Sequence, residues 1–252
     1  MKKTNISALL LAALLLIQLL CAPVSAVTAE PAADAQADAQ TASDNSAEDA
    51  AAEADSVPED QLLSSREQFS VAAKAALLID LNTNRVVYEQ DADERVYPAS
   101  LTKIMTCLVA LENGNLSDVV TVSESALADL DEDSSVAGLV VGEQMTLENL
   151  LYCMMVVSGN DACNVIAEHV AGSVTDFVRM MNQRAYELGC TNTHFNNPHG
   201  LHDESHYTTA RDLAIITQAA LKSENFRQIV DTYEYKLPDD NMRQNIPKLK
   251  TT

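Results

Sequence analysis

The residues of this chain best suited to covalent chemistry are a serine and a lysine three positions apart, Ser100 and Lys103. They lie at a predicted helix start, where residues three apart share a face, so the hydroxyl and the amine can meet. A serine hydroxyl is a weak nucleophile without a base beside it, and lysine is a base only when neutral, which burial promotes. The S-x-x-K spacing therefore predicts an activated serine, although a solvated pair on an ordinary helix has the same pattern.

A second polar group follows in Ser158-Gly159-Asn160, which falls in a predicted break between two apolar helices. Such a turn can project a hydroxyl and an amide into a cleft, or it can simply link two helices with Asn160 as a cap. The combination with S-x-x-K favours nucleophilic acyl transfer, and the helix start aims backbone N–H groups where an oxyanion could form.

The elements that must position these residues read as α+β. Short apolar runs on either side of an Asn-rich turn predict a β-hairpin, and capping residues followed by apolar residues at helical spacing predict helices. The hairpins are expected over 75–89 and 233–246, a strand near 119–122, and helices over 101–112, from Thr146, from Asn160 or Asp161, from Ser173 and from Thr209.

The N-terminal part of the chain indicates export. Lys2 and Lys3 precede an apolar run that is shorter than the roughly 20 residues of a membrane span, and Val24-Ser25-Ala26 suits signal peptidase, so residues 1–26 are predicted to be a signal peptide. Residues 27–66, rich in Ala and acidic side chains, are predicted to be a disordered linker, and 67–252 the catalytic domain. The formal charge of −21 excludes the usual electrostatic route to nucleic acid.

Pro98-Ala99-Ser100-Leu101-Thr102-Lys103, Ser158-Gly159-Asn160-Asp161-Ala162 and the stretch from Asn192 to Asp212 resemble the serine-type D-alanyl-D-alanine carboxypeptidases, the low-molecular-weight penicillin-binding proteins. The resemblance implies a β-lactamase/DD-peptidase-like fold, with a helical lobe packed on an antiparallel sheet. It also implies an exported cell-wall enzyme, acting in the wall or at the outer face of the membrane with possible peripheral association. Its partner would be a peptidoglycan stem peptide ending in D-Ala-D-Ala, with β-lactams as inhibitors and no cofactor.

The resemblance also implies roles for individual residues. Ser100 would attack the carbonyl carbon between the two D-alanines, Lys103 would take its proton, and Ser158 would relay a proton to the leaving D-alanine. Asn160 would hold the substrate amide or Lys103, and His199 would border the cleft. The family's third motif, K-T-G, does not occur in the sequence, and Lys250-Thr251-Thr252 lacks its glycine. We therefore expect a catalytic domain that is incomplete at its C-terminus and has little activity unless the chain is extended through K-T-G.

Other reactive residues favour structural roles. Cys107, Cys153, Cys163 and Cys190 lack metal-like spacing and are expected to be buried free thiols, and the loop histidines 199, 202 and 206 are expected to bind no metal. Two alternatives to the carboxypeptidase remain open. One is an inactive or non-catalytic wall-binding fragment, and the other is a serine β-lactamase, which is a poorer fit because no Glu-x-x-Leu-Asn element follows residue 160.

Overall fold

The structure, a computed structural model, describes residues 71–251 except 129 and 131–133. The predicted signal peptide (1–26), the predicted linker (27–66) and Thr252 lie outside the described residues. Among the described residues, no helix is long and apolar enough to cross a membrane.

The predicted first hairpin is confirmed. Strands β1 (Ala76–Ile79) and β2 (Val86–Gln90) pair antiparallel, with Ala76 opposite Gln90 and an irregularity between Leu78 and Ile79. The Asp80 carboxylate accepts hydrogen bonds from the amides of Asn82 and Thr83, which closes the turn between the strands.

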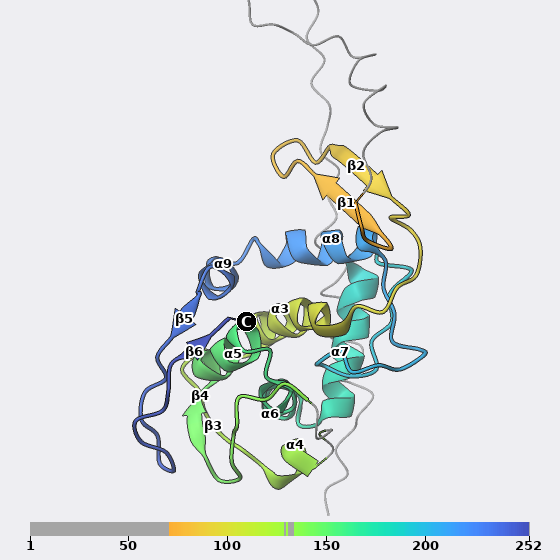
Figure 1. Ribbon diagram of the computed structural model, residues 1–252. Coiled ribbons are helices and arrows are strands. Elements are labelled where there is room, and N and C mark those ends of the chain that lie inside the picture. The colour runs from red at the N-terminus through yellow and green to blue at the C-terminus, as the bar shows by residue number, and fades with distance from the viewer. Residues whose placement is uncertain (1–70, 129, 131–133, 252) are drawn as a thin grey trace, which may run out of the picture. The chain divides into compact units, whose positions relative to one another are not determined.

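Seven α-helices and one 3₁₀ turn make up the helical part of the described chain, and α3 lies at its centre. α3 contacts each of α5 to α9, and Figure 1 shows it between α8 and α6. The elements are η1 (Ala99–Leu101), α3 (Thr102–Asn113), α4 (Glu124–Ala128), α5 (Leu147–Val156), α6 (Asn160–Ala171), α7 (Val174–Glu187), α8 (Ala210–Ala220) and α9 (Glu224–Val230).

Side-chain caps fix where several of these helices begin. Thr146, Ser173 and Thr209 each accept a hydrogen bond from the amide three residues on, so the predicted starts of α5, α7 and α8 are confirmed. The predicted helix from Asn160 or Asp161 is present as α6, but its predicted cap is wrong, because Gly159 is the N-cap residue and no side chain caps the helix. The polar side chains of Asn160 and Asp161 are instead used in tertiary contacts.

The remaining strands form two further antiparallel pairs among the described residues. β3 (Val119–Thr121) pairs with β4 (Gln144–Thr146), and β5 (Glu234–Tyr235) pairs with β6 (Leu249–Lys250). The second predicted hairpin is therefore wrong, because residues 242–246 form no strand and β5 pairs with β6 instead. The α+β class is confirmed, with strands in three separate pairs rather than in one sheet.

Buried apolar side chains from α3, α5, α6 and α7 form the main core. Most residues of α5 are inaccessible, as its apolar composition on every face predicts. The four described cysteines are free and buried in this core, as expected. Burial of so much of α3 and α5 gives the polar residues at the ends of these helices a rigid support.

Candidate active site

The S-x-x-K residues lie together at the N-terminal end of α3. Ser100 sits in η1 and is exposed, whereas Lys103 is in the first turn of α3 and is only 3% exposed. The distance between Lys103 Nζ and Ser100 Oγ is 3.5 Å. This is longer than a strong hydrogen bond, as is common for catalytic pairs in the absence of substrate.

The Lys103 amine is surrounded by uncharged acceptors. Nζ donates to Asn160 Oδ1 at 2.8 Å and to the main-chain carbonyl of His199 at 2.9 Å. A neutral amine has two N–H bonds and one lone pair, so these two acceptors would occupy both N–H bonds and leave the lone pair for the Ser100 hydroxyl. Burial lowers the pKa of Lys103 below 10.5, although Cys163 and Asp161 act in the opposite direction.

Ser158 also lies beside Ser100. Its Oγ lies 3.0 Å from Ser100 Oγ, and Ser158 occupies the short connection between α5 and α6. Its backbone has a positive φ of 58°, which is unusual for a residue other than glycine. The strained turn directs the Ser158 hydroxyl at Ser100, so the structure brings together all three residues that the sequence predicts to be catalytic.

The loop before α8 packs against the turn that carries Ser100. A Cβ atom added to Gly200 would lie 1.8 Å from the carbonyl oxygen of Ala99, so only glycine fits beside this turn. His206 Nε2 lies 2.8 Å from Thr102 Oγ1, and Thr106 Oγ1 donates to the carbonyl of Pro198 at 2.6 Å. The 198–206 loop is therefore tied to α3 at several points.

The two buried histidines of this loop are held neutral. Desolvation lowers the pKa of His199 and of His206 to about 4, and the nearby Lys103 contributes at His199. His206 Nδ1 accepts the amide of Asn196, so in the neutral ring Nε2 carries the proton and donates to Thr102. Among the described residues, no group of His, Cys, Asp and Glu side chains has the arrangement of a metal site.

His199, predicted to contact substrate, reaches the site through its main chain. Its carbonyl accepts from Lys103, the residue is only 8% exposed, and its Nδ1 accepts the amide of Leu201. A contact between the ring and substrate stays a prediction. Lys250 lies in β6, where its ammonium is 3.2 Å from Glu234 Oε2.

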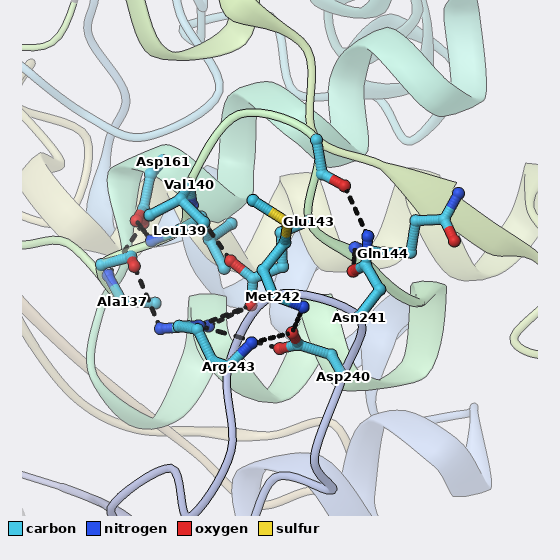
Figure 2. A network of polar contacts seen from close by, with 12 residues as sticks. Ala137, Leu139, Val140, Glu143, Gln144, Asp161, Asp240, Asn241, Met242 and Arg243 are labelled. Atoms are coloured by element: carbon cyan, nitrogen blue, oxygen red, sulfur yellow. Dashed lines mark hydrogen bonds and ion pairs between the residues drawn. The ribbon is translucent and has the colours of Figure 1, made fainter.

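Sequence reasoning missed three supporting residues, which are Thr102, His206 as its partner, and Asp161. Each of the Asp161 carboxylate oxygens accepts a backbone amide, from Ala137 at 2.9 Å and from Leu139 at 3.0 Å (Figure 2). The sequence shows Asp161 as a candidate helix cap and as part of the Ser158–Ala162 motif, and neither pattern indicates that it binds a loop. Contacts to a distant loop amide leave no pattern in a single sequence.

Comparisons with known proteins agree with this geometry. A family model described as D-alanyl-D-alanine carboxypeptidase matches residues 62–249. D-alanyl-D-alanine carboxypeptidase DacF of Bacillus subtilis is 42% identical over 181 residues, which cover 70% of this chain and 44% of that protein. D-alanyl-D-alanine carboxypeptidase DacC of Escherichia coli is 41% identical over 160 residues, which cover 60% of this chain and 40% of that protein.

Solved structures give the same family. Penicillin-binding protein 5 from Haemophilus influenzae has a TM-score of 0.65 and 35% identity, over 73% of this chain and 53% of that chain. The Streptomyces K15 DD-transpeptidase has a TM-score of 0.67 and 32% identity, over 73% of this chain and 74% of that chain. The chain belongs to the D-alanyl-D-alanine carboxypeptidase family, and its DD-peptidase-like fold is confirmed. It spans less than half the length of the two curated relatives above.

Proposed function

We propose that these residues form the acylating centre of a serine D-alanyl-D-alanine carboxypeptidase that trims peptidoglycan stem peptides. The observation that carries the proposal is the position of Ser100 Oγ, which lies between the buried amine of Lys103 at 3.5 Å and the Ser158 hydroxyl at 3.0 Å. A hydroxyl between a base and a second proton carrier can both lose its proton and pass one on. Family membership and the printed names of the relatives support the same reaction.

In the acylation step, Ser100 Oγ attacks the carbonyl carbon of the penultimate D-alanine, and its proton passes to Lys103 Nζ. The tetrahedral intermediate then collapses. The C–N bond to the terminal D-alanine breaks, and the departing nitrogen receives the proton through Ser158. The products are free D-alanine and an acyl ester on Ser100, and Lys103 is again neutral. Water hydrolyses the ester in a second step, which releases the shortened peptide.

Asn160 serves this reaction by giving Lys103 an acceptor without charge. Its Oδ1 lies 2.8 Å from Nζ, where a carboxylate would stabilise the ammonium, raise the pKa of Lys103 and leave less of the neutral amine to accept a proton. The Asn160 amide or the His199 ring would also contact the bound peptide. A β-lactam would enter by the same attack and remain as a stable acyl ester.

The proposal places the protein outside the cytoplasm. Residues 1–26 would direct export, the acidic segment 27–66 would be a spacer, and residues from 67 onward would form the catalytic domain. The substrate would then be wall peptide ending in D-Ala-D-Ala, and the protein would act in the wall or at the outer face of the cytoplasmic membrane. Peripheral attachment to either is part of this proposal.

The deciding experiment is labelling with a fluorescent penicillin. A chain extended through a K-T-G strand is compared with its Ser100→Ala and Ser117→Ala variants, of which Ser117 is an exposed serine that bonds Asn115. We expect stoichiometric label on the wild type and on Ser117→Ala, and none on Ser100→Ala, with the label mapped by mass spectrometry to the peptide containing Ser100. Lys103→Met should lower the labelling rate by about 10²-fold or more.

Each other outcome has a definite meaning. An unlabelled wild type that still binds purified peptidoglycan would contradict the proposal and favour the wall-binding alternative. Rapid release of the label as hydrolysed penicillin would favour a β-lactamase. The 252-residue chain is labelled in parallel, and fast labelling of it would overturn the expectation that a K-T-G strand is required.

A further inference from the structure

A loop of residues 134–142 packs directly on the Ser158 turn. The Asn160 amide donates to the carbonyl of Ser135 at 2.8 Å, and the Asp161 carboxylate binds two amides of the same loop. The fit is close at Gly159, where an added Cβ would be 3.1 Å from the Ala137 nitrogen. The loop therefore forms one wall of the turn that presents Ser158.

The Ser158 conformation depends on such a wall. A residue other than glycine at φ 58° is held in a sparsely populated conformation, which persists only where the surrounding structure over-determines it. If the loop moved away, Gly159 and Ser158 would be free to relax toward more favourable angles. The Ser158 hydroxyl would then leave its position 3.0 Å from Ser100 Oγ.

Arg243 holds this loop from its other side (Figure 2). Its Nη1 donates to the carbonyl of Gly138 at 3.0 Å, and Gly138 lies between the two amides that Asp161 binds. Its Nε donates to Glu143 Oε1 at 2.8 Å, and Nη2 contacts the same oxygen. Glu143 in turn accepts the Val140 amide through Oε2 at 3.0 Å. One guanidinium thus fixes the loop both directly and through Glu143.

The surroundings of Arg243 keep it in this position. Asp240 accepts the amides of Met242 and Arg243, each at 2.7 Å, and thereby shapes the turn that presents the guanidinium. Asn241 donates to the carbonyl of Gly142 at 2.9 Å. Glu143 is fully buried, and burial together with Asp240 raises its pKa, whereas Arg243 lowers it. A buried carboxylate of this kind needs a cation beside it.

We propose that Arg243 is a positioning residue for Ser158, acting through the 134–142 loop and the Asp161 carboxylate. The inference rests on the proposed function, because it concerns how the proton relay of that same site is held. It assigns a catalytic consequence to a residue that touches neither substrate nor nucleophile. The path runs from Arg243 to Gly138 and Glu143, then to the loop amides and Asp161, and so to the Ser158 turn.

The test separates positioning from stability. Arg243→Gln leaves two nearly buried carboxylates, Glu143 and Asp240, without a cation and so risks unfolding. The double variant Arg243→Gln/Glu143→Gln leaves only Asp240, which keeps the amides of Met242 and Arg243 as donors. Arg211→Gln is the matched control. It removes another guanidinium that binds two carboxylates, Asp93 at 2.7 Å and Glu89 at 2.9 Å, with no contact to the loop. Arg243→Lys keeps the charge but not the fork that reaches both acceptors.

The readout is penicillin acylation, resolved into the dissociation constant of the non-covalent complex and the first-order acylation constant. We expect the double variant to lower the acylation constant by about tenfold or more, the size expected when a catalytic group is misplaced. Its dissociation constant should stay within about twofold of wild type. The acylation constant of Arg243→Lys should lie between those of the wild type and the double variant, and that of Arg211→Gln should equal the wild-type value.

Failure of this inference is distinguishable from failure of the proposed function. A wild type that is never acylated at Ser100 removes the function, and the inference with it. A wild type that is acylated, with a double variant that folds and acylates equally fast, removes only the role of Arg243. Amide hydrogen exchange adds a readout independent of activity. The amides of Ala137 and Leu139 should exchange faster in the double variant than in Arg211→Gln. Equal exchange would contradict the inference that Arg243 holds the 134–142 loop.

Discussion

The close approach of Gly200 to the nucleophile turn makes one substitution especially informative. In Gly200→Ala, the new Cβ would lie 1.8 Å from the oxygen and 2.4 Å from the carbon of the Ala99 carbonyl. Because real Cβ contacts are almost never shorter than 3.0 Å, the Ala99 carbonyl must move by about 1.2 Å. That carbonyl belongs to the residue directly before Ser100, so the proposed nucleophile must move with it.

The expected cost has two parts. Gly200 has a φ of +94°, and an L-residue there costs about 1–2 kcal/mol. Forcing an extra methyl group into a packed site adds about 1–3 kcal/mol. Gly172→Ala is the matched control, because Gly172 has a φ of +81° but open space around its Cβ. The reduced entropy of the unfolded chain, which favours alanine, is the same for both and cancels in the comparison.

The assay is thermal unfolding of both variants beside the wild type. For a domain of this size, 1 kcal/mol corresponds to about 2–4 °C in Tm, so Gly200→Ala should unfold roughly 2–12 °C below Gly172→Ala. A displacement of about 1 Å at the nucleophile should also lower penicillin acylation by about 10²-fold, which Gly172→Ala should not do. Equal Tm values and equal acylation rates for the two variants would refute the reasoning from close contact.

Two further predictions concern ionisation. Asn160→Asp places a carboxylate beside Lys103 Nζ, so the pKa of Lys103 should rise by about 1–3 units. Because the proposed base is the neutral amine, the rising limb of the pH–acylation profile should then move to higher pH. An unmoved limb would contradict the proposal that Lys103 is the base. His206 has a pKa of about 4 in the folded chain against 6.5 unfolded, so its contribution of roughly 3 kcal/mol is present above pH 6.5 and is lost as the pH falls toward 4. His206→Gln should therefore lose less stability than the wild type between these pH values, as measured by urea unfolding.

Local signals explain which parts of the fold were predictable. The caps Thr146, Ser173 and Thr209 bind amides only three residues away, so a short stretch of sequence contains the whole interaction. The first hairpin was predictable for the same reason, because Asp80 closes its turn with adjacent amides. The short helices α4 and α9 were missed, since one or two turns carry too few apolar positions to show a period.

The second predicted hairpin failed for a tertiary reason. Residues 242–246 follow an Asp-rich turn and alternate well enough to suggest a strand, but Arg243 is bound to Glu143 and Gly138, far away in sequence. Those contacts hold the segment away from β5, and β5 pairs with Leu249 and Lys250 instead. A single sequence shows that Arg243 and Glu143 are charged, and it does not show that they meet.

The site likewise combines contacts that the local sequence predicts with contacts between distant residues that it does not predict. The three-residue spacing of Ser100 and Lys103 predicted their contact, because one helical turn supplies it. The basicity of Lys103 depends on groups that lie 57 and 96 residues away, Asn160 and the His199 carbonyl. Their meeting requires α3, α6 and the 198–206 loop to pack as they do, and this information is distributed over the whole core.

The order of two adjacent residues decides which chemistry this packing permits. Residues 160 and 161 open α6, where neighbouring positions face directions about 100° apart. The neutral amide therefore meets Lys103, and the carboxylate meets the amides of Ala137 and Leu139. Exchanging the two would put the negative charge against the amine, raise its pKa and leave the loop amides with a weaker acceptor. The order Asn160 then Asp161 thus gives Lys103 an uncharged acceptor and gives the 134–142 loop a charged one, and neither residue could take the other's place.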